Sequence, residues 1–192
     1  MQKRGHTADQ ILDVAQALVQ SHGYNGFSYA DVAQALRIRK PSIHHHFPAK
    51  ADLGRALMAR YRQRFGAALA EISASNARAA GKLQKYASLF RSVLQQDNRM
   101  CMCGMLAADF STLPRPLRDS VRDFFGDNED WLEGVLRLGR ADRALAFDGP
   151  PRAMAVRILA AFEGAMLVAR SFEDTSRFDT VARAVLGELK AT

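Results

Sequence analysis

The chain has 192 residues, of which 48% are hydrophobic and 24% charged, values typical of a globular protein with a sizeable core. There is no run of about eighteen apolar residues to span a membrane and no apolar N-terminal stretch to act as a signal peptide. Two cysteines cannot form a disulfide framework, so we expect a cytoplasmic protein with no membrane partner.

The positive charge is concentrated near the N-terminus. Residues 1–65 carry ten Lys and Arg against four acidic residues, a net +6, whereas residues 66–192 carry 17 against 16, a net +1. A basic segment of this kind favours a polyanionic partner. We therefore look for a nucleic-acid-binding motif in the first third of the chain.

Helical periodicity predominates and alternating strand patterns are absent, so the sequence predicts an all-α fold. Thr7 and Gln10 form a capping-box pattern that opens a first helix, and Gly23 ends that helix. Ser28, with Asp31 three residues later, caps a short second helix over 28–36.

Residues 37–40 form a basic turn, and residues 41–47 a third short helix. Two short helices joined by a four-residue turn are typical of a helix-turn-helix, which places its second helix in the DNA major groove. A long fourth helix over 50–72 then leads to a polar segment from Ser73 to Gly81, the expected domain boundary. Further helices are expected near 82–96, 103–111, 116–140, 151–172 and 177–190.

Ordered pieces of the N-terminal region match one family. They are Ile11-Leu12-x-x-Ala15, Gly23-Tyr24, Phe27-Ser28-Tyr29-x-x-Val32-Ala33, Ile38-x-Lys40-x-Ser42-Ile43-x-x-His46-Phe47 and Lys50-x-x-Leu53. In these pieces the chain resembles the tetracycline-repressor (TetR/AcrR) family of bacterial transcriptional regulators. It departs from the pattern where the family commonly has tyrosine, here His44, and glycine, here Arg37.

The resemblance implies a three-helix DNA-binding head over 1–50, joined by the fourth helix over 50–72 to a body of about six helices over 73–192. It implies that the body binds an unidentified small-molecule effector and forms a homodimer through its last two helices. Effector binding in such proteins usually releases a double-stranded DNA operator. We therefore expect a DNA-binding regulator, a repressor released from a palindromic operator.

On the third helix, a rotation of about 100° per residue places Ile43 and Phe47 toward the core and Pro41, Ser42 and His45 outward, toward base edges. Basic side chains and helix starts are expected to meet phosphate. Three consecutive histidines cannot converge on one metal ion, so none is expected. The expected DNA-binding residues are Lys3, Arg4, Thr7, Ser28, Tyr29, Arg39, Lys40, Pro41, Ser42, His44, His45, His46 and Lys50.

The near-neutral body has few obvious buried charges, which favours an apolar or mildly polar effector among aromatic side chains. Core packing is the alternative role for any one of these side chains. The expected pocket residues are Phe90, Leu94, Met105, Phe110, Phe124, Trp131, Phe162 and Met166.

Cys101 and Cys103 lie in a methionine-rich stretch and admit three roles: inert packing, redox or electrophile sensing, or binding of a soft metal. All five histidines lie in the first 46 residues, so the body holds no Ser-His-Asp or Cys-His site. We expect no enzyme activity and no cofactor. A DNA-packing protein without an effector is a further alternative, which the large aromatic body disfavours.

Overall fold

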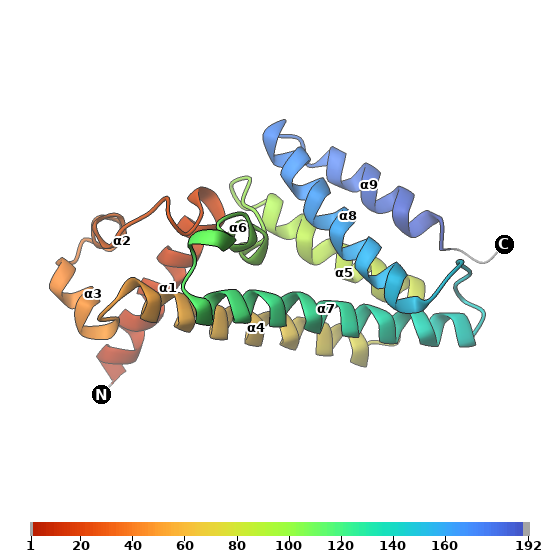
Figure 1. Ribbon diagram of the computed structural model, residues 1–192, viewed down its shortest axis with the longest axis horizontal. Helices are drawn as coiled ribbons and strands as arrows, with labels where there is room; N and C mark the ends of the chain where they lie inside the picture. Colours follow the sequence, from red (N-terminus) through yellow and green to blue (C-terminus); the bar gives the residue numbers. More distant parts are fainter. Residues whose placement is uncertain (1, 190–192) are drawn as a thin grey trace. The chain divides into compact units, whose positions relative to one another are not determined.

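The computed structural model describes the backbone of residues 2–189 and the side chains of residues 7–189 (Figure 1). Within that range the chain is helical and contains no β-strand, as the periodicity predicts. The elements are α1 (Gln2–His22), α2 (Tyr29–Leu36), α3 (Lys40–His46), α4 (Lys50–Ala74), α5 (Ala79–Leu94), α6 (Met102–Ala108), the 3-10 helix η1 (Phe110–Thr112), α7 (Arg115–Ala141), α8 (Pro151–Ser171) and α9 (Ser176–Gly187).

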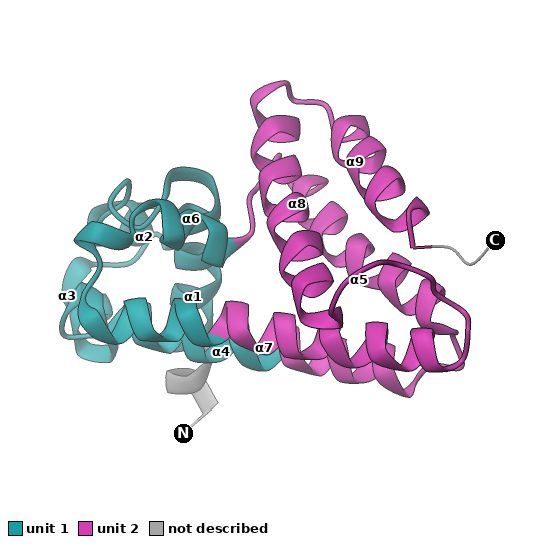
Figure 2. Cartoon of the chain, turned by 45° about the vertical axis from the view of Figure 1, so that its right-hand side comes forward, with its two compact units in different colours: residues 1–64, 102–123 teal, residues 65–101, 124–192 magenta. Residues whose placement is uncertain are grey.

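The helices form two compact units, which Figure 2 colours separately. Unit 1 comprises residues 1–64 and 102–123, and unit 2 comprises residues 65–101 and 124–192. The sequence predicts boundaries at residues 50 and 73 instead. The difference arises because α6, η1 and the first turns of α7 pack with the N-terminal helices, a tertiary contact that helical periodicity does not reveal.

Unit 1 has its core among the first four helices. Ile11 of α1, Val32 of α2, Ile43 of α3 and Leu53 of α4 are all fully buried. Burial of each such side chain contributes about 1.5–3 kcal/mol relative to exposure. Helices as short as α2 and α3 are marginal in isolation, so this packing fixes them in place.

The two predicted N-terminal caps have different outcomes. Ser28 caps α2 as predicted: its Oγ accepts from the Ala30 N–H at 3.1 Å, and its own N–H donates to Asp31 Oδ2 at 2.7 Å. The predicted cap at Thr7 is wrong, because α1 already begins at Gln2 and Thr7 lies inside it. A capping pattern marks a helix start only where the preceding backbone leaves the helix.

One carboxylate fixes the turn between α1 and α2. Asp109, at the end of α6, accepts hydrogen bonds from the backbone N–H groups of Tyr24 at 2.7 Å and Asn25 at 3.3 Å. The Asn25 side chain in turn donates to Thr112 Oγ1 at 2.7 Å. These contacts explain why residues that follow position 101 belong to unit 1.

Unit 2 has an aromatic core. α5 packs against α8 and α9, and α8 packs along α9. The side chains of Tyr86, Phe124, Phe162 and Phe178 are almost completely buried there. The helix α7 continues without interruption through Gly126.

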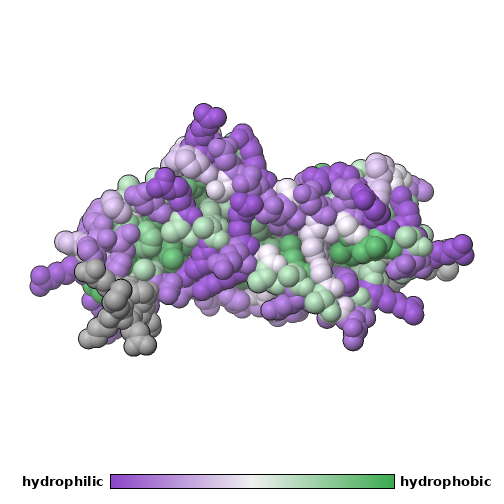
Figure 3. All heavy atoms as spheres, turned by 90° about the horizontal axis from the view of Figure 1, so that it is seen from below, coloured by the Kyte–Doolittle hydropathy of each residue, from purple (hydrophilic) through white to green (hydrophobic). Residues whose placement is uncertain are grey.

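The face shown in Figure 3 is mainly hydrophilic, with smaller apolar areas between charged side chains. Among the described helices, none combines the length and hydropathy needed to cross a lipid bilayer.

Two glycines of α7 provide a matched test of packing in unit 2. A Cβ at Gly139 would lie 2.5 Å from Leu145 Cδ1 and 2.6 Å from Ala79 Cβ, whereas a Cβ at Gly134 would meet nothing within 4 Å. We expect Gly139→Ala to lower the free energy of unfolding by about 1–3 kcal/mol through overpacking. Gly134→Ala should raise it by about 0.5–1 kcal/mol, because glycine is a poor helix former. Urea denaturation measures both, and equal shifts would refute the close approach.

Candidate functional site

The helix α3 presents a small outward surface. Its apolar side chain Ile43 is fully buried and Phe47, directly after it, is 8% exposed. Pro41, Ser42 and His45 are exposed, as the helical spacing predicts. Pro41 in the first turn suits a helix start, because proline needs no hydrogen-bonded N–H there. Ser42 and His45 can each donate or accept a hydrogen bond, which is the chemistry needed to contact base edges.

Three cations flank this surface. Arg37, Arg39 and Lys40 are exposed, and within the described part of the chain none of them has an ion-pair partner. Arg37 ends α2 with φ of 54°, in the left-handed region where glycine is favoured. The turn therefore keeps the geometry that the glycine of the family pattern would give, and it adds a positive charge.

The other two histidines of the run are partly engaged. His44 Nδ1 lies 3.1 Å from the carbonyl oxygen of Pro48, and its ring packs edge-on against Tyr29 with centroids 4.8 Å apart. If that nitrogen donates to the carbonyl, Nε2 is left as an acceptor. His46 is half-buried between the rings of His45 and Phe47. His45 is thus the histidine whose ring lies most freely on the outward surface.

Two expected phosphate contacts have internal partners instead. The buried Tyr29 hydroxyl donates to the Phe47 carbonyl oxygen at 2.9 Å, and burial raises the pKa of Tyr29 to about 12. Lys50 Nζ donates to the Phe27 carbonyl oxygen and lies 4.8 Å and 4.2 Å from the ring centroids of Tyr24 and Phe27. Burial also lowers the pKa of Lys50. Both polar groups hold the head together.

The remaining residues expected to contact DNA differ in their structural setting. Ser28 is exposed at the start of α2, where its side chain is used in the capping box. Thr7 is half-buried within α1 and so is not at a helix start. The side chains of Lys3 and Arg4 lie outside the described residues.

Within unit 2, a buried polar pair lies in the aromatic core. The Tyr86 hydroxyl donates to Asn128 Oδ1 at 2.9 Å, and Asn128 Nδ2 donates to the Phe124 carbonyl oxygen at 2.8 Å. Tyr86 and Asn128 are 0% and 1% exposed. This pair follows the rule that buried polar groups have hydrogen-bond partners.

Glu163 of α8 departs from that rule. Both of its carboxyl oxygens are buried, and neither reaches a hydrogen-bonding N–H or O–H group. The thiol of Cys101 lies beside it. Burial, with a smaller contribution from Cys101, raises the pKa of Glu163 well above its usual value. The expectation that the body has few buried ionisable groups overlooked this carboxyl group, because its sequence context shows only an acid between Phe162 and Gly164.

Aromatic rings surround this polar region. Tyr86 stacks on Trp131 with centroids 5.3 Å apart and on Phe162 with centroids 6.0 Å apart. Phe90 lies edge-on to Tyr86 and Phe162, at 5.1 Å and 5.7 Å. Of the residues expected to line a pocket, Phe90, Leu94, Phe124, Trp131, Phe162 and Met166 belong to unit 2, and Met105 and Phe110 belong to unit 1.

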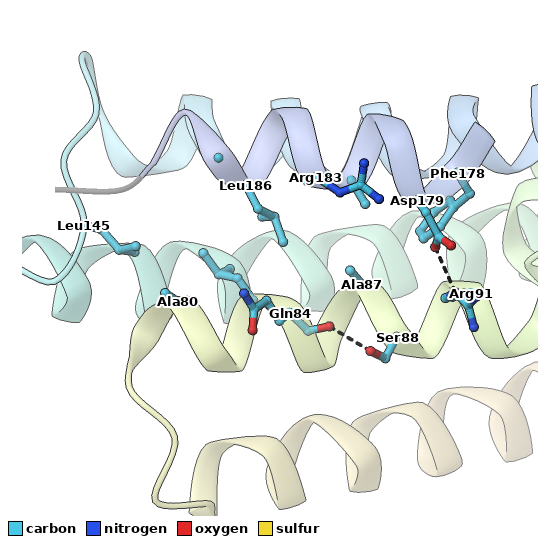
Figure 4. A pocket seen from close by; sticks show the side chains of 13 residues that line it. Ala80, Gln84, Ala87, Ser88, Arg91, Leu145, Phe178, Asp179, Arg183 and Leu186 are labelled. Carbon is cyan, nitrogen blue, oxygen red and sulfur yellow. Dashed lines mark hydrogen bonds and ion pairs between the residues drawn. The ribbon is translucent and has the colours of Figure 1, made fainter. Parts of the chain in front are cut away.

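The surface of unit 2 also carries a cleft of about 380 Å³, lined by residues of α5 and α9 (Figure 4). Phe178 and Leu186 contribute apolar walls. Arg91 and Asp179 face each other as an ion pair at 2.8 Å, and Arg183 lies nearby. None of the pocket residues expected from the sequence lines this cleft.

The two cysteines are both buried. Cys103 Sγ lies 3.9 Å from Met58 Sδ within unit 1, and Cys101 lies beside Glu163 in unit 2. A thiol reacts as the thiolate and needs access to the reagent, so burial favours a packing role. Among the described side chains, no three His, Cys, Asp or Glu residues gather closely enough to hold a metal ion.

Two family models match the chain. The model described as bacterial regulatory proteins, tetR family, matches residues 11–57, and the model described as tetracyclin repressor-like, C-terminal domain, matches residues 79–185. A solved TetR-family regulator from Agrobacterium tumefaciens is 36% identical, with a TM-score of 0.94 over 98% of this chain and 100% of that one. A TetR regulator from Legionella pneumophila is 34% identical, with a TM-score of 0.88 over 96% and 97%.

Curated relatives are more distant. The transcriptional regulator AcuR of Cereibacter sphaeroides is 27% identical over 154 residues, which cover 77% of this chain and 69% of that protein. The HTH-type transcriptional repressor NemR of Escherichia coli is 24% identical over 179 residues, which cover 87% of each. These relatives are transcriptional regulators and not enzymes.

The different environments of two lysines allow a test of which one contacts DNA phosphate. Lys40 is exposed beside α3, whereas Lys50 is bound within the head. If Lys40 contacts phosphate, Lys40→Met should make the slope of log affinity against log salt concentration shallower by about one for each subunit. Lys50→Met should leave that slope nearly unchanged and lower the stability of the protein.

Fluorescence anisotropy on a mixed-sequence duplex at several salt concentrations gives the slopes, and urea denaturation gives the stabilities. A Lys50→Met slope that changes as much as the Lys40→Met slope would show that Lys50 leaves its internal position to bind phosphate.

Proposed function

Because the chain belongs to the TetR family of bacterial transcriptional regulators, we propose that it is a homodimeric repressor that leaves a palindromic operator when a small effector binds its body. Members of the family bind DNA operators, dimerise and bind small-molecule effectors. The observation that carries the proposal is the outward surface of α3, whose exposed Ser42 and His45 lie beside three cations that have no ion-pair partner among the described side chains.

The proposed roles of these residues on DNA follow from the charge and hydrogen-bonding capacity of their side chains. Arg37, Arg39 and Lys40 meet phosphate and position the head, whereas Ser42 and His45 contact base edges and discriminate between sequences. Hydroxyl and imidazole groups accept several base partners, so the discrimination at each position is modest. A two-fold dimer places two such heads on half-sites that are about one helical turn or more apart.

Exposed apolar side chains on α8 support dimerisation through the last two helices. Val156, Leu167, Val168 and Phe172 are 43%, 55%, 49% and 60% exposed. Small residues of α8, among them Gly164, line a groove of about 490 Å³ together with Arg177, Thr180 and Val181 of α9. An apolar surface of this kind on a helix pair fits a second copy across a two-fold axis, as a four-helix interface.

A route from effector to DNA is present in the chain itself. Cys101 lies beside Glu163 in the core of unit 2, and the next residue begins α6. The far end of α6 carries Asp109, which holds the backbone of Tyr24 and Asn25 in the turn before α2. A displacement of the core at Cys101 is therefore transmitted along α6 to the helices of the head. The burial of both thiols weighs against the alternative of an oxidant or electrophile sensor.

Selection of bound duplexes from a random pool tests the proposed DNA contacts. The selected sequences should form a palindrome. His45→Ala should relax the preference at one position of each half-site, with a loss of about 1–3 kcal/mol in discrimination. Arg39→Ala should weaken binding to all sequences nearly equally. The assignment of roles fails if His45→Ala lowers affinity uniformly and leaves the selected sequence unchanged.

Charge placed on the exposed face of α8 tests the dimer. Leu167→Asp should give a monomer in analytical ultracentrifugation and should lower operator affinity strongly, because the two heads then bind independently. Leu138→Asp is the matched control: Leu138 is 63% exposed but lies on α7, and its replacement should leave the dimer intact. A dimer that survives Leu167→Asp would place the interface elsewhere.

A further inference from the structure

We infer that Glu163 is the polar anchor of the effector site, and that this site takes an apolar or aromatic molecule with a cationic head, such as a protonated amine. The inference rests on the proposed effector-controlled function and names the chemical class of the effector. The sequence predicts that apolar side chains contact the effector, whereas here a buried carboxyl group makes the main polar contact.

The first step is the contrast between two polar groups in one core. Asn128 and Tyr86 satisfy each other, and Asn128 also donates to a backbone carbonyl. Within the described residues, the two shielded oxygens of Glu163 reach no N–H or O–H donor, and only the weak S–H donor of Cys101 lies beside them. A buried acceptor without a partner costs free energy, and native proteins hold few of them. A glutamate that served packing alone would be replaced without loss by an apolar residue, so the carboxyl group is better explained by a ligand.

The second step is the charge around Glu163. The titratable groups that face it are Cys101 and Tyr86, neither of which is cationic. Glu129 acts on Tyr86 and forms an ion pair with Arg152 at 2.8 Å. Within the described residues, no Lys, Arg or His side chain pairs with Glu163. The missing positive charge is therefore one that a ligand can supply.

The third step is the surrounding surface. The stacked rings of Tyr86, Trp131 and Phe162 lie in the same core as Glu163. Aromatic faces attract cations, tryptophan most strongly, and they also pack against the apolar part of a ligand. Trp131 is only half-buried, and its Nε1 donates to Ser73 Oγ at 2.8 Å. Among the three stacked rings, Trp131 is thus the one that is open to solvent.

Proton linkage follows from the same arrangement. Burial holds the pKa of Glu163 well above its usual value, so the empty site keeps the carboxyl group protonated over a wider pH range than an exposed glutamate. A cation binds the carboxylate form, and its binding releases the proton. Affinity for a cationic ligand should therefore rise with pH, by up to about tenfold per unit below the raised pKa, and then level off. A neutral ligand should show no such rise.

The test uses three probes with one phenylbutyl body: 4-phenylbutylamine, 4-phenylbutanol and 4-phenylbutyrate. Trp131 is the single tryptophan of the chain and stacks on Tyr86, so its fluorescence reports binding. The amine should bind the full-length protein at least tenfold more tightly than the alcohol, and the acid should bind weakest. Calorimetry in two buffers of different ionisation enthalpy should show proton release with the amine alone.

Glu163→Gln should lose at least tenfold in amine affinity, together with the pH dependence and the proton release, and should keep its affinity for the alcohol. The matched control is Glu188→Gln, because Glu188 is exposed and forms an ion pair with Arg157. That variant should behave like the unaltered protein. Urea denaturation verifies that Glu163→Gln is folded, and the pH dependence of amine binding to the unaltered protein tests the inference without any substitution.

The outcomes separate the two proposals. Equal binding of amine and alcohol, preference for the acid, or full amine affinity in Glu163→Gln would overturn the assignment of a cation site. Amine binding at Glu163 that leaves operator DNA bound would support the site and overturn effector-controlled release by this class of ligand. Release of operator by a ligand of another class, with amines inactive, would overturn the site and support the proposed function.

Discussion

The outward surface of α3, which we propose contacts DNA, depends on the burial of one side chain in a helix too short to be stable alone. α3 has seven residues, and Ile43 at its centre is fully buried against the other helices of the head. Because the helix is anchored on that side, Ser42 and His45 must face away. The Tyr29 hydroxyl holds the Phe47 carbonyl oxygen and fixes the end of α3. The orientation of the outward surface is thus set by packing, before any DNA is present.

The helices could be predicted from local sequence, because their causes are local. Apolar spacing located them all, and Ser28 with Asp31 identified the cap of α2. The outward face of α3 followed from the same periodicity. The false cap at Thr7 shows the limit, since a local pattern cannot show that the backbone before it is already helical. Arg37 shows another limit, because the absence of the family's glycine at this position does not reveal that the residue there adopts a left-handed conformation.

Features that depend on contacts between residues far apart in the sequence could not be predicted. Lys50 reads as a free cation in the sequence, but two aromatic rings and the Phe27 carbonyl oxygen hold it. Asp109 reads as an ordinary surface acid, yet it accepts from two backbone amides more than eighty positions away in the chain. Glu163 follows the same rule, because its burial results from the packing of α8 with other helices. The role of each of these three polar residues is determined by neighbours that are distant in the sequence.

Two of these polar residues have a role in the proposed switch. Glu163 would bind the ligand, and Asp109 holds the turn next to the DNA-binding helices. A ligand shifts a conformational equilibrium only as far as its affinity differs between the two states. Within the described residues the carboxyl group of Glu163 has the Cys101 thiol beside it and no cation, so a cationic ligand gains a strong interaction that the core itself does not offer. In the proposed switch, admission of the ligand would displace the residues beside Glu163, including Cys101, which directly precedes α6. Asp109, directly after α6, accepts from the backbone of the turn before α2, so a displacement of α6 would be coupled to the arrangement of the head. Under this proposal, the free energy gained when a cation pairs with the carboxyl group favours the protein state that has a lower affinity for DNA.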